Sequence, residues 1–272
     1  MLSIITTCFN IIQNWRKERF EKMIESIQDQ TYKDFEHIVI DWWSNDWTLD
    51  ILKRYKKKWY ITKLVSEKDN WVYEAMNKWI KLSKWKYINI MNTDDYFTDC
   101  NFFKDSIEIL ENSYFDFTHA DRIIKSRENK SDTIKKWSEK TAFFRMPFRH
   151  QTMIVKKNIF DELWLFDEKL KIASDYKFVL KMLLSWKEWY YIPKIFVCSL
   201  DWWISSNRKL CIKEVSKVIY DSYGKLYNLN LTDCKNIYEQ TISIWLLIKI
   251  LLNIKDRKIK KSLLRNFIQR YI

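Results

Sequence analysis

The sequence predicts an α/β fold: a mostly parallel sheet flanked by helices, followed by a helical C-terminal tail. Two observations lead to this prediction. Short apolar, β-branched runs alternate with amphipathic helical segments over the first 95 residues, which is typical of parallel sheets. Polar and acidic residues follow four of the expected strands directly, at the edge of the sheet where ligands bind. A chain of 272 residues, 47% hydrophobic and 31% charged, is neither disordered nor fibrous.

The expected elements follow from hydrophobic spacing, continuous in buried strands and three to four residues apart in helices. Strands are expected at 2–7, 37–41, 61–65 and 87–91, with helices between them at 16–29, 49–57 and 72–82. After residue 100 we expect helices at 102–110 and 175–184, strands at 116–120, 152–155 and 190–197, and a loop or hairpin at 122–140. Residues 1–205 are expected to form the α/β domain and 206–272 a basic helical extension.

The net charge of +13 is concentrated in the tail. Residues 206–272 hold 14 Lys and Arg against 5 Asp and Glu, whereas residues 1–205 hold 34 against 30. If residues 1–205 bound nucleic acid, the excess of positive charge would lie within them. The acidic residues at the strand ends would also repel phosphates. The charges therefore argue against a nucleic-acid partner, and we expect none. A basic, aromatic-rich nucleic-acid-binding module is kept as the alternative function.

The cysteines and the apolar segments predict a cytoplasmic protein. Five scattered cysteines without a C-x-x-C pair are typical of reduced thiols. The longest apolar stretch, residues 242–254, contains Lys249 and is shorter than the roughly 20 residues of a membrane span. The basic run that follows it predicts peripheral contact of residues 242–272 with an anionic membrane surface. A helix that merely covers the core is the alternative.

Several motifs, in order along residues 1–205, carry a resemblance to a known family. They are Ser3-Ile-Ile-Thr-Thr-Cys-Phe-Asn10, Gln30-Thr-Tyr-Lys-Asp-Phe-Glu36, Ile40-Asp41, Ser66-Glu67-Lys68-Asp69-Asn70, Tyr73-Glu74-Ala75-Met76-Asn77-Lys78, Asn92-Thr93-Asp94-Asp95, His150-Gln151, Phe166-Asp167 and Ala173-Ser174-Asp175-Tyr176. In this set the chain resembles family-two glycosyltransferases. The resemblance implies the GT-A (nucleotide-diphospho-sugar transferase, Rossmann-like) fold and an inverting enzyme of hexosyltransferase type.

The resemblance also implies a donor, a metal and an acceptor. The donor is a nucleotide-sugar, with a UDP-sugar favoured, and the acceptor is a glycan or a lipid-linked molecule in polysaccharide biosynthesis. Mn²⁺ or Mg²⁺ would be held by Asp94 and Asp95, since hard cations prefer oxygen ligands. Asn92-Thr93-Asp94 stands where the family has Asp-x-Asp, so it stays open which of the two acids binds the metal. Solvated acids in a turn are the alternative.

The remaining site residues take their roles from the same resemblance. Asp41 would accept a hydrogen bond from the base, and Asp175 would be the general base that deprotonates the acceptor. The predicted nucleotide-sugar contacts are Thr7, Asn10, Asp41, Asp69 and Asp94, and the predicted acceptor or phosphate contacts are Asp121, His150 and Gln151. The alternatives are a turn cap for Asp41, a helix cap for Asp175 and a core histidine for His150.

Tryptophan stands repeatedly where the resembled family has glycine. The family's Asp-Gly-Gly-Ser-x-Asp-Gly-Thr reads Asp41-Trp-Trp-Ser-Asn-Asp-Trp-Thr48 here, and the chain has 15 tryptophans but one glycine. Further such positions are Trp71, Trp79, Trp85, Trp164, Trp202 and Trp203. Tight turns with positive φ favour glycine over bulky side chains. We therefore hypothesise that UGA codons for glycine have been translated as tryptophan at most of these positions, with Trp15 and Trp189 as candidates for genuine tryptophan. A genuine tryptophan-rich surface that stacks sugars is the alternative. If genuine tryptophans block the pocket, the chain is an inactive glycosyltransferase-like protein.

Overall fold

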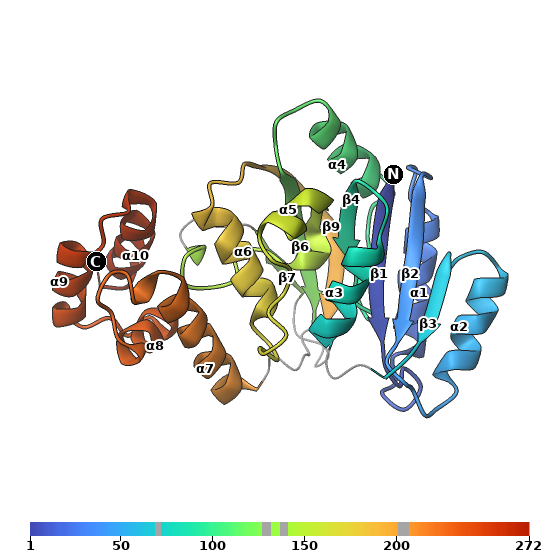
Figure 1. Ribbon diagram of the computed structural model, residues 1–272, viewed down its shortest axis with the longest axis horizontal. Coiled ribbons are helices and arrows are strands. Elements are labelled where there is room, and N and C mark those ends of the chain that lie inside the picture. The colour runs from blue at the N-terminus through green and yellow to red at the C-terminus, as the bar shows by residue number, and fades with distance from the viewer. Residues whose placement is uncertain (69–71, 127–131, 137–140, 201–206, 272) are drawn as a thin grey trace. The chain divides into compact units, whose positions relative to one another are not determined.

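The computed structural model describes residues 1–68, 72–126, 132–136, 141–200 and 207–271 (Figure 1). The chain forms two compact units that are discontinuous in sequence. The first unit comprises Met1–Trp137, Phe148–Glu168 and Lys187–Asp201, and the second comprises Ser138–Pro147, Lys169–Trp186 and Trp202–Ile272. The division into domains at residue 205 stays a prediction.

Four parallel strands form the first half of the sheet in the first unit. They are β1 (Leu2–Cys8), β2 (Phe35–Asp41), β3 (Lys63–Ser66) and β4 (Tyr87–Ile90), in the spatial order β3-β2-β1-β4. The helices that connect them are α1 (Lys17–Gln28), α2 (Thr48–Lys57) and α3 (Val72–Leu82) (Figure 1). The predicted alternation is confirmed, so the carboxyl ends of all four strands meet at one edge of the sheet.

The other strands make the sheet mixed. They are β5 (Tyr96–Phe97), β6 (Phe117–Lys125), β7 (Thr133–Lys135), β8 (Met153–Lys156) and β9 (Trp189–Leu200). Strand β8 pairs antiparallel with both β4 and β6, whereas β6 and β9 are parallel. Strand β7 pairs antiparallel with β6, which agrees with the hairpin alternative for residues 122–140.

The core of the first unit lies between the sheet and its helices. Helix α1 buries Phe20, Met23, Ile24 and Ile27, whose spacing puts them on one face. A cluster of four phenylalanines extends this core where α4 (Phe102–Glu111) packs on the sheet. The ring centroids of neighbouring members are 5.0 to 6.0 Å apart, and the members are Phe97, Phe102, Phe103 and Phe196.

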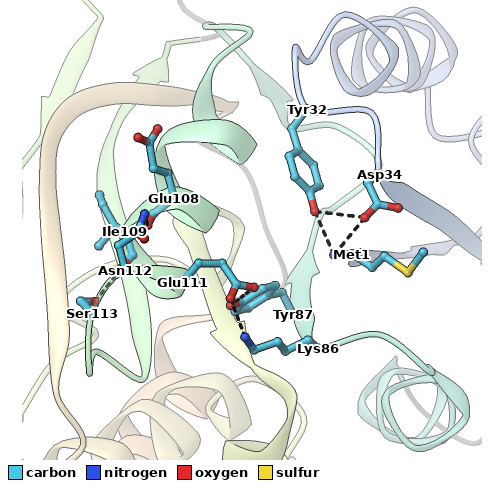
Figure 2. Close-up of polar contacts among 10 residues, drawn as sticks. All are labelled: Met1, Tyr32, Asp34, Lys86, Tyr87, Glu108, Ile109, Glu111, Asn112 and Ser113. Atoms are coloured by element: carbon cyan, nitrogen blue, oxygen red, sulfur yellow. Dashed lines mark hydrogen bonds and ion pairs between the residues drawn. The ribbon is translucent and has the colours of Figure 1, made fainter.

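Polar contacts close the opposite edge of the sheet, at the amino ends of β1 and β4 (Figure 2). The Glu111 carboxylate accepts hydrogen bonds of 2.7 Å from the Tyr87 hydroxyl and the Lys86 ammonium. Burial and the Glu111 hydrogen bond raise the pKa of Tyr87 to about 12. The amino group of Met1 donates to the Tyr32 hydroxyl at 2.8 Å. These contacts tie α4 and the chain start to the sheet, away from the acidic carboxyl edge.

The second unit is helical. Its helices are α6 (Ser174–Leu184), α7 (Arg208–Ile219), the π-helical turn Tyr220–Gly224, α8 (Leu231–Glu239), α9 (Ile244–Asn253) and α10 (Arg257–Tyr271). The buried Glu214 carboxylate accepts backbone hydrogen bonds from Lys171, Ile172 and Ala173, which fixes the segment that enters α6. Within the described residues, none of the helices is both long and apolar enough to cross a bilayer.

Asn77 of α3 anchors a remote segment of the first unit. Its buried amide donates to the Phe166 carbonyl and to Glu168 Oε1, both at 2.8 Å, and accepts from the Phe166 N–H at 2.9 Å. All three bonds join parts of the chain about 90 residues apart.

We expect Asn77→Ala to lower the free energy of unfolding by about 1–3 kcal/mol, because it removes the three hydrogen bonds of this buried amide. Urea denaturation measures the change. The control is Asn158→Ala on α5 (Lys157–Glu162), whose exposed amide contacts Glu162 at 3.0 Å and should matter by less than about 0.5 kcal/mol. Equal losses in both variants would contradict the anchoring role.

Candidate active site

Two loops at the carboxyl edge are locked together by side-chain hydrogen bonds. Residues 9–16 follow β1, and residues 42–47 follow β2 (the 42–47 loop). The Asn10 amide donates to Asn45 Oδ1 at 2.8 Å and accepts from the Asn45 N–H at 3.0 Å. Asp46 accepts from the backbone of Ile12, Gln13 and Thr48. Burial raises the pKa of Asp46, but hydrogen bonds from the Thr48 side chain and from these backbone groups outweigh it and lower the pKa below its ordinary value. The two loops are therefore preformed as one unit.

Asp41 ends β2 inside this edge and is fully buried. Its carboxylate accepts from the Ser66 hydroxyl at 2.7 Å and from the Ser44 N–H at 3.3 Å. Asp41 therefore does cap the turn into the 42–47 loop, and contact with a base stays a prediction. Thr7 lies one residue before the end of β1 and is half-buried. Asp69 lies outside the described residues.

The turn after β4 carries the two acids predicted to bind metal. Asp94 and Asp95 are both buried, 1% and 0% exposed. Asp95 Oδ2 accepts from the Gln151 amide at 2.6 Å and from the Asn92 amide at 3.1 Å. His150 Nε2 lies 3.4 Å from Asn92 Oδ1. The structure thus brings together five predicted or neighbouring polar residues that are up to 59 positions apart in the sequence.

His150 and Gln151 precede the strand expected at 152–155, which the structure has as β8 (Met153–Lys156). They lie in a 3-10 turn, His150–Thr152, directly before β8. The turn is held in place by Asn89 of β4, whose amide donates to the carbonyls of Gln151 and Met153. This anchoring holds the Gln151 amide against Asp95.

The electrostatics of this turn favour a cation. Burial, and then the negative charge of Asp94, raise the pKa of Asp95 above its ordinary value. Asp95 Oδ1 is buried and accepts no hydrogen bond in the described part of the chain. Mg²⁺ is usually held by one or two carboxylates together with substrate phosphates and water. No group of three or more His, Cys, Asp or Glu able to hold a metal occurs among the described residues. The unsatisfied oxygen of Asp95, beside a second buried carboxylate, is the kind of ligand that a hard divalent cation takes.

Arg19 is a site residue that sequence reasoning missed. Its Nε donates to the carbonyl oxygen of Asp94 at 2.6 Å, and its guanidinium lies 5.2 Å from the centre of the Tyr96 ring. The contact links α1 to a turn 75 residues later. No local motif signals such a contact, because it depends on how α1 packs beside β5. Ser44, Asn45 and Ser66 stand in motifs quoted from the sequence, but their contacts with Asp41 and Asn10 were not predicted.

Asp121 lies on β6, where the pairing with β9 shifts register. It is buried and accepts from the Tyr191 hydroxyl at 2.8 Å. Burial and this hydrogen bond raise the pKa of Tyr191 to about 12. The predicted role of Asp121 on the acceptor side stays a prediction.

Asp175 belongs to the second unit, in the first turn of α6. It is 7% exposed, and its Oδ1 accepts from the Tyr176 N–H at 2.7 Å. A carboxylate in the first turn of a helix is stabilised by the helix dipole, so Asp175 is a dipole partner of α6, although its side chain does not cap the helix. The role as general base stays a prediction.

Comparison with known proteins decides the family. The model of glycosyl transferase family 2 matches residues 3–169. The chain belongs to this family. It is a glycosyltransferase, 26% identical over 96% of both chains to an uncharacterised glycosyltransferase of Methanocaldococcus jannaschii. A segment covering 46% of the chain is 27% identical to the Escherichia coli UDP-Glc:alpha-D-GlcNAc-diphosphoundecaprenol beta-1,3-glucosyltransferase WfaP, over 47% of that protein.

Solved structures show that the fold is GT-A. S. aureus TarS 1–349 in complex with UDP-GlcNAc matches with a TM-score of 0.65 at 16% identity, over 99% of this glycosyltransferase and 72% of that chain. The mannosyltransferase PcManGT from Pyrobaculum calidifontis, in complex with GDP-Man and Mn²⁺, matches with a TM-score of 0.60 at 13% identity, over 98% and 86% of the two chains. The glycosyltransferase spans 43% of a longer TarS chain.

We expect Mn²⁺ to raise the melting temperature of the glycosyltransferase, because the cation offsets the repulsion between Asp94 and Asp95. At a hundred times its dissociation constant, a ligand stabilises by about 2.7 kcal/mol, or about 5–11 °C for a chain of this size. Differential scanning fluorimetry measures the shift.

The double variant Asp94→Asn/Asp95→Asn should lose this shift, whereas Asp161→Asn, an exposed acid of α5, should keep it. The melting temperature without Mn²⁺ checks that each variant is folded. An undiminished Mn²⁺ shift in the folded double variant would rule out this site.

Proposed function

We propose that the glycosyltransferase is an inverting enzyme that transfers a sugar from a UDP-sugar to a glycan or a lipid-linked acceptor in polysaccharide biosynthesis. The observation that carries the proposal is the buried Asp94–Asp95 pair with its unsatisfied Asp95 oxygen, at the same sheet edge as the preformed loops. TarS in complex with UDP-GlcNAc and the UDP-Glc named for WfaP support a UDP-sugar as donor.

Asp94 and Asp95 would hold Mn²⁺ or Mg²⁺, which when bound neutralises the diphosphate and stabilises the departing nucleotide. Gln151 and Asn92 position Asp95 by hydrogen bonds to its Oδ2, which leaves Oδ1 for the cation. Arg19 holds the turn through the Asp94 carbonyl. Mn²⁺ in the PcManGT complex supports a divalent metal.

Asp41 would accept a hydrogen bond from N–H of the uracil ring. Ser66 and Ser44 already hold its carboxylate in one orientation, which limits the entropy lost when a base binds. Thr7, Asn10 and Asp69 would line the same donor site. His150 and Asp121 would contact the phosphate or the acceptor.

Asp175 would take the proton from the acceptor hydroxyl as its oxygen attacks the anomeric carbon. One base and one leaving group imply a single displacement, so the configuration at that carbon inverts. The bond from the anomeric carbon to the diphosphate oxygen breaks as the new glycosidic bond forms, and the proton ends on Asp175.

We expect Asp175→Asn to lower the maximal rate by about 10² to 10⁴-fold, the usual contribution of a general base, with donor affinity nearly unchanged. Asp41→Asn should instead weaken donor affinity and change the maximal rate less. The substitution removes a carboxylate oxygen that would accept a hydrogen bond from the base, which affects donor binding more than the chemical step. UDP release from a panel of UDP-sugars, with UDP affinity measured separately, gives both quantities.

Asp161→Asn is the control and should change neither quantity. If Asp175→Asn loses donor affinity and keeps its maximal rate, Asp175 is a binding or capping group. The base would then be sought at Asp121 or His150.

The tail of the second unit supports a second proposal, peripheral contact with an anionic membrane. Helix α9 buries Leu246 and Ile250, so it does cover the core of its unit. Its other face exposes apolar side chains at helical spacing, Ile244, Ile248, Leu251 and Leu252. The Lys260 ammonium donates to the Leu251 carbonyl at 2.9 Å, which places a cation beside the exposed leucines. Apolar and basic groups together suit an anionic lipid surface.

We expect Lys255→Gln/Lys261→Gln to weaken binding to phosphatidylglycerol-containing vesicles by about 30-fold, since each basic residue near such a surface contributes about 1 kcal/mol. Vesicle co-sedimentation measures it. The control, Lys53→Gln/Lys57→Gln, removes the same charge from exposed positions of α2 in the first unit and should change binding little. Equal losses in both would indicate nonspecific attraction by net charge.

A further inference from the structure

Five tryptophans adopt a backbone conformation that L side chains rarely take. Their φ angles are positive, between 51° and 67°. Nine residues other than glycine have a positive φ in the described part of the chain, and five of them are tryptophan. The five are Trp15 (55°), Trp43 (51°), Trp59 (64°), Trp164 (67°) and Trp186 (56°). The single glycine, Gly224, is not among the residues with positive φ.

The left-handed region is unfavourable for a side chain because Cβ approaches the backbone carbonyl oxygen. Glycine has no Cβ and enters this region freely, and asparagine tolerates it. A buried indole could offset the strain by packing, but these five indoles are between 63% and 92% exposed. Packing therefore gives no reason for tryptophan at positions 15, 43, 59 and 164. At position 186 the indole has a surface contact with the Lys258 ammonium, which lies 4.2 Å from the ring centre.

Three of the five occupy the position directly after a helix C-cap, where glycine is the usual residue. Trp59 follows the Lys58 C-cap of α2, Trp164 follows Leu163 of α5, and Trp186 follows Ser185 of α6.

The hydrogen bonds at the end of α2 form a complete Schellman motif. The Trp59 N–H donates to the Lys56 carbonyl at 3.1 Å, and the Tyr60 N–H donates to the Tyr55 carbonyl at 3.1 Å. This motif places a left-handed residue at position 59. After α5, the Leu165 N–H likewise donates to the Phe160 carbonyl at 3.0 Å. The backbone at the ends of α2 and α5 therefore has the left-handed conformation that glycine adopts most readily.

Trp15 and Trp43 lie in the two loops at the carboxyl edge of the sheet. Around Trp15, the Arg16 N–H donates to the Ile11 carbonyl at 2.8 Å, the same six-residue closure as at the helix ends. Trp43 stands between Asp41 and Ser44, whose N–H returns to the Asp41 carboxylate. Both turns need a left-handed residue to close.

We infer that positions 15, 43, 59, 164 and 186 are glycine in the protein as its own cells make it, with UGA codons read as glycine. The amino-acid composition supports the same inference without reference to the backbone. Glycine and tryptophan together make up about 6% of the chain, close to the roughly 7% expected for glycine alone. Trp71, Trp202 and Trp203 lie outside the described residues, so the backbone argument does not extend to them.

At position 43 the inference also bears on the donor site. A glycine there removes a large exposed indole two residues after Asp41, on the 42–47 loop that would receive the nucleotide. This consequence rests on the proposed function, whereas the identity of the five residues does not.

Peptide mass spectrometry of the protein purified from its source cells tests the inference. Peptides that cover positions 15, 43, 59, 164 and 186 should carry glycine at each of them. Tryptophan at any of the five positions would overturn the inference. The result does not depend on activity, so it is separate from any failure of the proposed function.

Thermal unfolding of the chain made from a synthetic gene provides a second test. Replacing all five tryptophans by glycine should raise the melting temperature, by about 2–4 °C for each site where the relieved strain is near 1 kcal/mol. The matched control is Trp245→Gly, which removes an equally exposed indole (80%) from within the helix α9. It should not raise the melting temperature, because glycine weakens helices. No rise in the fivefold variant would contradict the inference.

Discussion

The arrangement of the carboxyl edge of the sheet depends on two carboxylates, Asp94 and Asp95, that are adjacent in sequence and buried by the fold. Burying a charge is costly unless a partner compensates for it. The protein supplies only part of that compensation. Gln151 and Asn92 donate to one oxygen of Asp95, and its other oxygen accepts no hydrogen bond among the described groups. We propose that a divalent cation, together with the phosphates of a donor, supplies the missing compensation for this pair at the carboxyl edge of the sheet.

The rest of the first unit keeps this pair in place. Strand β4 delivers the turn, β8 runs antiparallel beside it, and Asn89 holds the 3-10 turn that carries Gln151. Arg19 reaches the same turn from α1. On the neighbouring strands, Asn10 and Asp46 join two loops before any ligand is present. A site assembled in this way is preorganised, so less binding energy is lost in ordering it.

The sequence was sufficient for the first four strands, because their apolar runs and the helical spacing between them are local signals. It was also sufficient to identify the family, and to single out Asp41, Asp94 and Asp95 at strand ends. It could not reveal that Asp95 is held by Gln151, since that contact joins residues 56 positions apart and depends on β8 pairing antiparallel with β4. For residues 122–140 it left a loop and a hairpin both open, because β7, a strand of three exposed residues, has no hydrophobic pattern and forms by pairing with β6.

Calorimetric titration with UDP, with Mn²⁺ present and then chelated, tests the central claim most directly. If Asp94 and Asp95 hold a cation that binds the diphosphate, Mn²⁺ should tighten UDP binding by about 5- to 150-fold, the usual range of coupling between two ligands. The gain should vanish in Asp94→Asn/Asp95→Asn. Equal UDP affinity with and without Mn²⁺ in the unchanged chain would contradict the account.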